Sequence, residues 1–295
     1  MAQLRIGFVG LGIMGRPMAE RLRDAGFPLL AYDARADATT GFASAESLMD
    51  VARRSDVVIT MLPDGEAVRR VTVGDGDRLV DGLASGAILV DMGSSSPTDT
   101  RELGQTLAAR GIAMLDAPVS GGVARARTGT LAIMVGGERA TIDRCRPLFT
   151  PLGTQVFETG PLGSGHAVKA LNNLVSAAGF LAAAEALLIG RRFGVDPGVV
   201  LDVFNASTAR NNSTENKFRP FVLSRSFASG FSLGLMVKDL GTAVALAEST
   251  GMTAPFAMRC AELWTAAQRA RGPAADHTEI VRWLEALVGT TLSNG

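Results

Sequence analysis

Short apolar segments alternate with stretches of helical spacing through the first half of the chain, and they predict buried strands. These segments are Leu4–Val9, Leu29–Asp33, Asp56–Leu62, Ala87–Asp91, Ile112–Asp116 and Leu131–Val135, each flanked by Gly, Pro, Asp or Ser. Between the first two, Met14–Ala25 has apolar positions at helical spacing, and Gly26 is placed to end that helix. Continuous apolar strands separated by helices are typical of a parallel sheet covered on both faces. We therefore expect residues 1–162 to form a doubly wound α/β domain.

The second half is expected to be wholly helical. Residues 166–193 run without proline and are rich in Ala and Leu, which predicts one long helix over residues 165–193. Gly194 and Gly251 are placed to end helices, and Asp196-Pro197 is placed to start one. No alternating strand pattern occurs over residues 196–294. We expect an all-α domain over residues 163–295 that begins with the long helix between the domains.

The long helix could also be a membrane span. Lys169, Asn172, Asn173 and Glu185 interrupt it, and few of its positions carry the bulky side chains that a bilayer favours. A helix that is apolar nearly all round is more often buried between domains or subunits. We therefore expect no membrane association.

Length, charge and cysteine content narrow the class of protein. The 295 residues exceed what one compact core usually supports. Lys and Arg together number 29, as do Asp and Glu, so no overall field attracts nucleic acid. Cys145 and Cys260 cannot form a disulfide framework and are expected to be packed thiols of a cytoplasmic protein. The 2 histidines are too few for a zinc site without carboxylates at ligand spacing, and we expect no metal.

A glycine-rich motif follows the first predicted strand. Gly10-Leu11-Gly12-Ile13-Met14-Gly15 lies between that strand and an amphipathic helix, which is the context in which the motif binds a dinucleotide. Gly10 allows the tight turn, Gly12 lets the backbone approach a pyrophosphate, and Gly15 lets the helix pack against the strand. The free N–H groups of the helix N-terminus favour the same anion. The motif predicts a Rossmann-type domain that binds NAD or NADP.

Other strand ends are expected at the same edge of the sheet. Asp33 ends the second strand, where a carboxylate accepts hydrogen bonds from the adenosine ribose and repels a 2′-phosphate, which favours NAD. Arg35 nearby leaves NADP possible, because an arginine can accommodate that phosphate. Met61-Leu62-Pro63 and Ser94 follow two further strands and are expected to contact the cofactor.

Two segments carry candidate chemistry. Ser120-Gly121-Gly122 offers a hydroxyl and uncovered backbone N–H groups that suit a substrate carboxylate, although a plain loop explains it about as well. Lys169 and Asn173 lie one turn apart on the long helix. Partial burial and the helix dipole both favour loss of the lysine proton, which suits proton transfer. His166, one turn earlier, could reach the same site but is interpreted as a residue of the helix cap. Lys238-Asp239 is either a polar contribution to the site or part of a solvated helix face.

Four segments, taken together and in this order, resemble the β-hydroxyacid dehydrogenases, the group of 3-hydroxyisobutyrate dehydrogenase and tartronate semialdehyde reductase. They are Gly7–Gly15, Asp116–Gly122 with Gly129–Leu131, Gly163–Asn173, and Lys238–Leu240, and the resemblance covers essentially the whole chain. One departure concerns Val123–Arg127, where the family usually continues with a Gly-Ala pair. That difference leaves the shape of the substrate loop, and so the substrate, open.

The resemblance implies a role for each matching residue. Lys169 would be the catalytic acid/base, and Ser120, Gly121, Gly122 and Asn173 would hold the substrate. Lys238 would lie near the nicotinamide and Asp239 beside the active site, while Ser94 stands where the family usually has a threonine. The family's C-terminal helices commonly pack on another subunit, which implies a homodimer or homotetramer.

These observations predict an NAD-dependent oxidoreductase that interconverts a small β-hydroxy acid and its semialdehyde or keto partner. An NADP-preferring semialdehyde reductase or an imine reductase on the same scaffold is the alternative. An imine reductase would usually replace the catalytic lysine, so Lys169 argues against it. A cofactor-binding domain without catalysis is the third possibility, and an intact proton-transfer residue argues against that one.

Overall fold

The computed structural model describes residues 3–293, so the outermost residues of the two predicted domains, 1–2 and 294–295, lie outside the described residues. The chain divides into two compact units, residues 1–169 and 170–295. The division falls inside the long helix α7 (Ser164–Phe193), whose first turn belongs to the first unit. The domain boundary expected after residue 162 lies just before that helix and stays a prediction.

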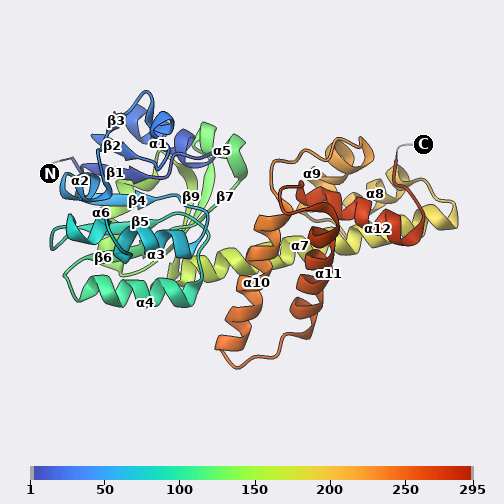
Figure 1. The fold of residues 1–295 in the computed structure, drawn as a ribbon. Helices are drawn as coiled ribbons and strands as arrows, with labels where there is room; N and C mark the ends of the chain where they lie inside the picture. The colour runs from blue at the N-terminus through green and yellow to red at the C-terminus, as the bar shows by residue number, and fades with distance from the viewer. Residues whose placement is uncertain (1–2, 294–295) are drawn as a thin grey trace. The chain divides into compact units, whose positions relative to one another are not determined.

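The first unit is built on a nine-stranded sheet (Figure 1). Its strands are β1 (Ile6–Val9), β2 (Leu29–Tyr32), β3 (Ala43–Ser44), β4 (Val57–Thr60), β5 (Ile88–Asp91), β6 (Ala113–Asp116), β7 (Val119–Ser120), β8 (Leu131–Gly136) and β9 (Gly153–Gly160). The order is β3-β2-β1-β4-β5-β6-β8-β7, with β9 paired to β8. Strands β1 to β6 are parallel, as predicted.

The sheet departs from parallel pairing at one side. Strand β8 runs antiparallel to β6 and β7. Only Ala117 and Pro118 separate β6 from β7, and the two strands pair with β8 in one continuous antiparallel register, from Asp116 opposite Gly136 to Ser120 opposite Ala132. Three strands, β3, β7 and β9, were also not expected.

Helices cover both faces of the sheet, which confirms the doubly wound α/β class. They are α1 (Gly15–Asp24), α2 (Leu48–Arg53), α3 (Gly65–Val73), α4 (Pro97–Ala108), α5 (Gly122–Thr128) and α6 (Arg139–Phe149), with short 3₁₀ turns at 36–39 and 79–81. One buried cluster joins α1, α5 and α6 to Phe8 and Ile59, and another joins α2, α3 and α4 to Val9 and Val58. Successive side chains of a strand point to opposite faces of the sheet, so neighbouring residues such as Phe8 and Val9 pack against different sets of helices.

The second unit is helical, as predicted. It contains most of α7, then α8 (Pro197–Ala206), α9 (Asn212–Asn216), a π-helical segment (Phe218–Leu223), α10 (Leu233–Ser249), α11 (Pro255–Arg271), a 3₁₀ turn (His277–Glu279) and α12 (Ile280–Val288). Gly194 and Gly251 adopt positive φ after α7 and α10, and the Asp196 carboxylate caps α8. Phe180 stacks on Phe218 with ring centroids 4.7 Å apart in its core.

Helix α7 is long and apolar enough, by length and composition, to cross a membrane, with a mean hydropathy of 1.6 over its most apolar window. Its residues Ala177, Phe180, Ala184 and Leu187 are nevertheless buried in the core of the second unit. Helix α7 therefore serves as a core helix of that unit.

Candidate active site

The glycine loop between β1 and α1 has one glycine, Gly12, with free space beside its backbone. Gly10 adopts a φ of 97°, and a Cβ there would lie 2.5 Å from the carbonyl oxygen of Met61. A Cβ on Gly15 would lie 1.9 Å from the carbonyl oxygen of Gly10. Nothing lies within 4 Å of a Cβ placed on Gly12. Packing of the protein thus requires Gly10 and Gly15, whereas Gly12 leaves free space beside the backbone, which fits a dinucleotide pyrophosphate.

Asp33 lies directly after β2 and contacts this loop. Its Oδ2 accepts the backbone N–H of Leu11 at 2.7 Å, and its Oδ1 accepts the N–H of Arg35 at 2.9 Å. The Arg35 side chain adds an ion pair at 3.6 Å. Burial raises the pKa of the neighbouring Tyr32 phenol, and the charges of Asp77 and Asp33 raise it further. Asp33 therefore anchors the glycine loop and places a negative charge beside it.

The other predicted cofactor residues lie at the same edge of the sheet. The N–H of Met61 donates to the carbonyl of Val9, and the N–H of Met92 donates to that of Thr60, each at 2.9 Å. These bonds extend the pairing beyond β1, β4 and β5, and so the loops that contain Leu62, Pro63 and Ser94 follow neighbouring strands. Ile13 of the glycine loop is 79% exposed, and Met14 precedes α1.

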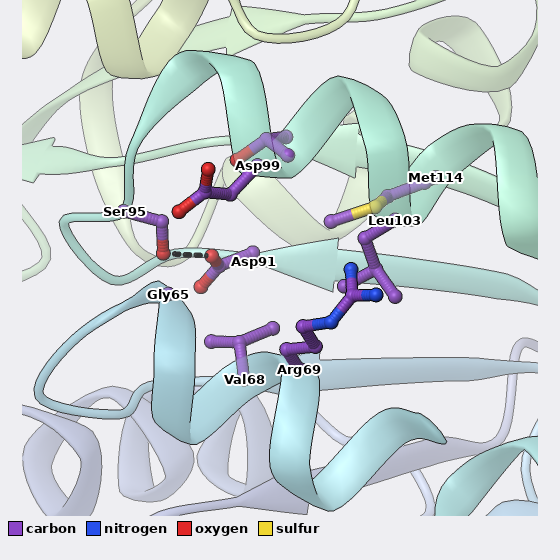
Figure 2. A pocket seen from close by; sticks show the side chains of 9 residues that line it. Gly65, Val68, Arg69, Asp91, Ser95, Asp99, Leu103 and Met114 are labelled. Atoms are coloured by element: carbon purple, nitrogen blue, oxygen red, sulfur yellow. Dashed lines mark hydrogen bonds between the residues drawn. The ribbon is translucent and has the colours of Figure 1, made fainter. Parts of the chain in front are cut away.

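A buried carboxylate holds the loop after β5 in place. Asp91 accepts the hydroxyl of Thr60 at 3.2 Å, the N–H of Gly93 at 3.0 Å and the hydroxyl of Ser95 at 2.6 Å. Figure 2 shows the bond from Ser95 to Asp91 beside a small pocket that Gly65 and Arg69 also line. Asp91 thus holds both Thr60, at the end of β4, and the loop after β5 that contains Ser94.

The predicted substrate loop owes its shape to glycine. Ser120 pairs with Ala132 at the end of β7. Gly121 and Gly122 then adopt φ angles of 134° and 67°, which side-chain-bearing residues rarely adopt. Side-chain carbons of Arg125 lie where a Cβ on Gly121 would be, the nearest at 2.5 Å, while the space beside Gly122 is open. Arg125, one of the residues between 123 and 127, therefore packs against Gly121 of the segment predicted to bind the substrate carboxylate.

The start of α7 is fastened to the strand that leads into this loop. The fully buried Asp116 accepts the N–H of Gly163 and the N–H of His166, both at 2.7 Å. A Cβ on Gly165 would lie 2.2 Å from the carbonyl oxygen of Met134, so only glycine permits this close approach. Lys169, which is half-buried, follows His166 by one turn. The predicted acid/base is thus anchored through its own helix to the end of β6.

The remaining predicted residues meet within the second unit. Asn173 is buried, and its amide donates to the Asp239 carboxylate at 2.5 Å. Lys238 lies 3.7 Å from the same carboxylate. Helices α7 and α10 therefore bring Asn173, Lys238 and Asp239 into one polar cluster. In residues 3–293 no group of three or more His, Cys, Asp or Glu side chains is placed to hold a metal ion.

Sequence reasoning missed the buried polar residues Asp91, Thr100 and Asp116 and undervalued His166. His166 is 1% exposed and hydrogen bonds to Thr100, so it is more than a residue of the helix cap. The available signal was that two more predicted strands, besides the one that ends at Asp33, each end in an aspartate. Such a strand end looks like an ordinary turn in the sequence, because some of the groups that donate hydrogen bonds to the carboxylate lie up to about 50 residues away.

Comparison with known proteins covers both units. A family described as the NAD binding domain of 6-phosphogluconate dehydrogenase matches residues 5–160. Another, described as NAD-binding of NADP-dependent 3-hydroxyisobutyrate dehydrogenase, matches residues 163–284.

Similar proteins act on small hydroxy acids. The 2-(hydroxymethyl)glutarate dehydrogenase of Eubacterium barkeri is 32% identical over 99% of this chain and 98% of its own. The NAD-dependent L-serine dehydrogenase of Pseudomonas aeruginosa is 36% identical over 85% of this chain and 88% of its own. The structure of Mycobacterium tuberculosis 3-hydroxyisobutyrate dehydrogenase with L-serine superposes with a TM-score of 0.87 at 34% identity, covering 96% of this chain and 99% of that one. An imine reductase from Myxococcus stipitatus, at 18% identity and a TM-score of 0.66, covers 96% of this chain and 100% of its own and shares the fold alone.

Proposed function

Since the chain belongs to the β-hydroxyacid dehydrogenase family, we propose that it interconverts a small β-hydroxy acid and its semialdehyde or keto partner. It is an NAD(P)-dependent oxidoreductase that acts on a CH–OH group. The main structural support is the pair of hydrogen bonds that the Asp116 carboxylate accepts from the backbone of Gly163 and His166. These bonds join the end of β6, which leads to Ser120, to the helix turn before Lys169.

Each part of the chain has a proposed task. The loop that Gly10 and Gly15 shape holds the pyrophosphate beside Gly12. The residues around the rest of the cofactor are Ile13, Met14, Met61, Leu62, Pro63, Ser94 and Lys238. Ser120, Gly121 and Gly122 hold the substrate carboxylate, and Asn173 and Asp239 orient the substrate hydroxyl. The nicotinamide, when bound, supplies the redox chemistry by accepting or giving a hydride. The Lys169 amine takes the hydroxyl proton during oxidation and returns it during reduction.

The role of Lys169 can be tested with two substitutions. Lys169→Ala should lower turnover by roughly 10²–10⁴-fold, the usual share of general acid–base catalysis, while NADH binding survives. Lys169→Arg is the matched control, since it keeps a positive charge but cannot release a proton near neutral pH. We expect it to be as inactive as the alanine variant. Normal turnover by either variant would show that another group handles the proton.

We propose NAD as the preferred cofactor because Asp33 places its charge beside the glycine loop. A screen should follow absorbance of the reduced cofactor with NAD and with NADP. L-Serine, 3-hydroxyisobutyrate and 2-(hydroxymethyl)glutarate are the first substrates to include, because similar proteins carry those names. A higher kcat/KM with NADP would contradict the preference. Activity on cyclic imines alone would favour the imine reductase, which the presence of Lys169 argues against.

We also propose a cytoplasmic homodimer or homotetramer. Apolar side chains of the second unit remain exposed, among them Val175 at 72%, Phe193 at 86% and Val203 at 56%. Exposed apolar side chains of this size favour association with another surface. Light scattering coupled to size-exclusion chromatography should give a mass of two or four chains, and a monomer at micromolar concentration would refute the assembly.

A further inference from the structure

His166 is a buried titratable residue that the proposed chemistry does not use. Its Nδ1 lies 2.9 Å from the Oγ1 of Thr100. The Thr100 hydroxyl also lies 2.8 Å from the carbonyl oxygen of Ser96, and a carbonyl oxygen can only accept. The single hydroxyl hydrogen therefore points at Ser96, so the contact with His166 needs a hydrogen on Nδ1. The hydrogen-bond pattern therefore places a hydrogen on Nδ1 of His166.

The other ring nitrogen faces a carboxylate. Nε2 lies 3.6 Å from the Oδ2 of Asp91 and has no hydrogen-bond partner. Asp91 is fully buried and accepts three donors, from Thr60, Gly93 and Ser95, which is the pattern of an ionised carboxylate. A bare lone pair on Nε2 would be repelled by that anion, whereas a proton on Nε2 makes the contact attractive.

Charge balance supports the same state. Asp116 is also fully buried, and its Oδ2 lies 3.7 Å from the Nδ1 of His166. Within residues 3–293, every ion pair that Asp91 or Asp116 makes is with His166. Buried charges without a partner of opposite sign are very costly. One imidazolium between two carboxylates offsets much of that cost.

We propose that His166 is a positioning residue, held as an imidazolium between Asp91 and Asp116. Asp91 comes from β5 and holds the cofactor loops, Asp116 comes from β6, and Thr100 comes from α4. The imidazolium ties these groups to the first turn of α7 and so sets the position from which Lys169 extends. The link to Lys169 rests on the proposed function, whereas the charge state of His166 does not.

Nitrogen NMR of the intact protein tests the charge state. The chain has 2 histidines, His166 and His277. At about pH 7.5, where a free histidine is mostly neutral, we expect one ring with both nitrogens protonated and one neutral ring. Burial lowers the pKa of His277 to about 4, so His277 is the neutral one, and the spectrum of His277→Gln assigns it. Two neutral rings would overturn the proposal.

A double-mutant cycle tests the positioning role. His166→Gln removes the cation and leaves Asp91 unbalanced, so we expect kcat to fall on the order of tenfold with the KM for NAD changed by less than about threefold. Adding Asp91→Asn removes one of the two anions left unbalanced, so the double variant should lose less kcat than the product of the two single losses. If the losses of the two single substitutions simply multiply in the double variant, His166 and Asp91 do not act together and the positioning role is refuted. A chain inactive on every hydroxy acid would overturn the proposed function, and the NMR spectrum would still decide the state of His166.

Discussion

His277 makes the stability of the second unit depend on pH. It is 4% exposed and stacks on Trp264 with ring centroids 6.3 Å apart. The pKa of His277 is lowered from 6.5 to about 4, mainly by burial and also by the positive charge of Lys217, while the charge of Asp276 and the hydrogen bond to the Phe231 carbonyl oppose that shift. The folded unit therefore holds the neutral ring, while the unfolded chain takes up a proton once the pH falls below 6.5.

The sign and size of the effect follow from this difference. Stability is fully present above pH 6.5 and is lost as the pH falls towards about 4, because the proton binds the unfolded state more tightly. Each pKa unit is worth about 1.4 kcal/mol, so the loss is about 3 kcal/mol. Asp276 is half-buried, which alone would raise its pKa, but hydrogen bonds from Thr278 and Ser229 lower the pKa overall. Its own contribution is therefore lost only at still lower pH.

Urea denaturation followed by tryptophan fluorescence measures this. Both tryptophans of the chain, Trp264 and Trp283, belong to the second unit, so the signal reports on that unit. His277→Gln is the control, because it removes this titration and leaves every other group. The free energy of unfolding of the wild type, minus that of the variant, should shrink by about 3 kcal/mol between pH 7 and pH 4. A difference that stays constant over that range would refute the reasoning.

Five further substitutions test the cofactor loop and helix α7. Gly12→Ala should leave the melting temperature unchanged and weaken NADH binding on the order of tenfold, about 1.4 kcal/mol, whereas Gly15→Ala should destabilise the first unit by roughly 3 kcal/mol or more because its Cβ would meet the Gly10 carbonyl. Asp33→Asn removes the charge that repels a 2′-phosphate, so the ratio of kcat/KM for NADP to that for NAD should rise, on the order of tenfold. Gly165→Ala should lower both melting temperature and turnover, because its Cβ would lie 2.2 Å from a carbonyl oxygen. Gly179→Ala, in the same helix with its nearest contact at 3.5 Å, should stabilise by about 0.5–1 kcal/mol.

Each of these tests has a result that would contradict it. Full NADH affinity in Gly12→Ala would mean that the open space beside this glycine is not where the cofactor binds. An unchanged cofactor ratio in Asp33→Asn would assign the carboxylate to anchoring the loop alone. Equal melting temperatures for the Gly165 and Gly179 variants would show that the contact at the start of α7 can relax.

Much of the fold could be predicted because buried parallel strands are continuous apolar runs. The six predicted strands all occur, since Val, Ile and Leu at neighbouring positions are buried on both faces of the sheet. Strand β9 was missed because most of its residues are exposed and only Val156 and Phe157 have apolar side chains, so it lacks the apolar run of an inner strand. Strands β3 and β7 have two residues each, too few for any periodicity.

The candidate site was predictable only where its residues stand close together in the sequence. The glycine loop, Lys169 and Ser120 stand in local motifs, so neighbouring residues identify them. The partners of Asp116 and the contact of Asp91 with Thr60 are set by the tertiary fold, and no local pattern distinguishes a buried aspartate at a strand end from one in a turn. Asn173 and Asp239 are 66 residues apart, and their contact depends on how α7 packs with α10.

The Asp116 contact bears on how this protein can be divided or recombined. A fragment that stops before residue 163 would keep the Asp116 carboxylate but lose both backbone N–H groups that donate to it and the His166 ring beside it. Such a fragment should express poorly or aggregate, even though it contains every strand of the sheet. Chimaeras with similar dehydrogenases should therefore be joined beyond the first two turns of α7, so that both sides of the contact come from one parent.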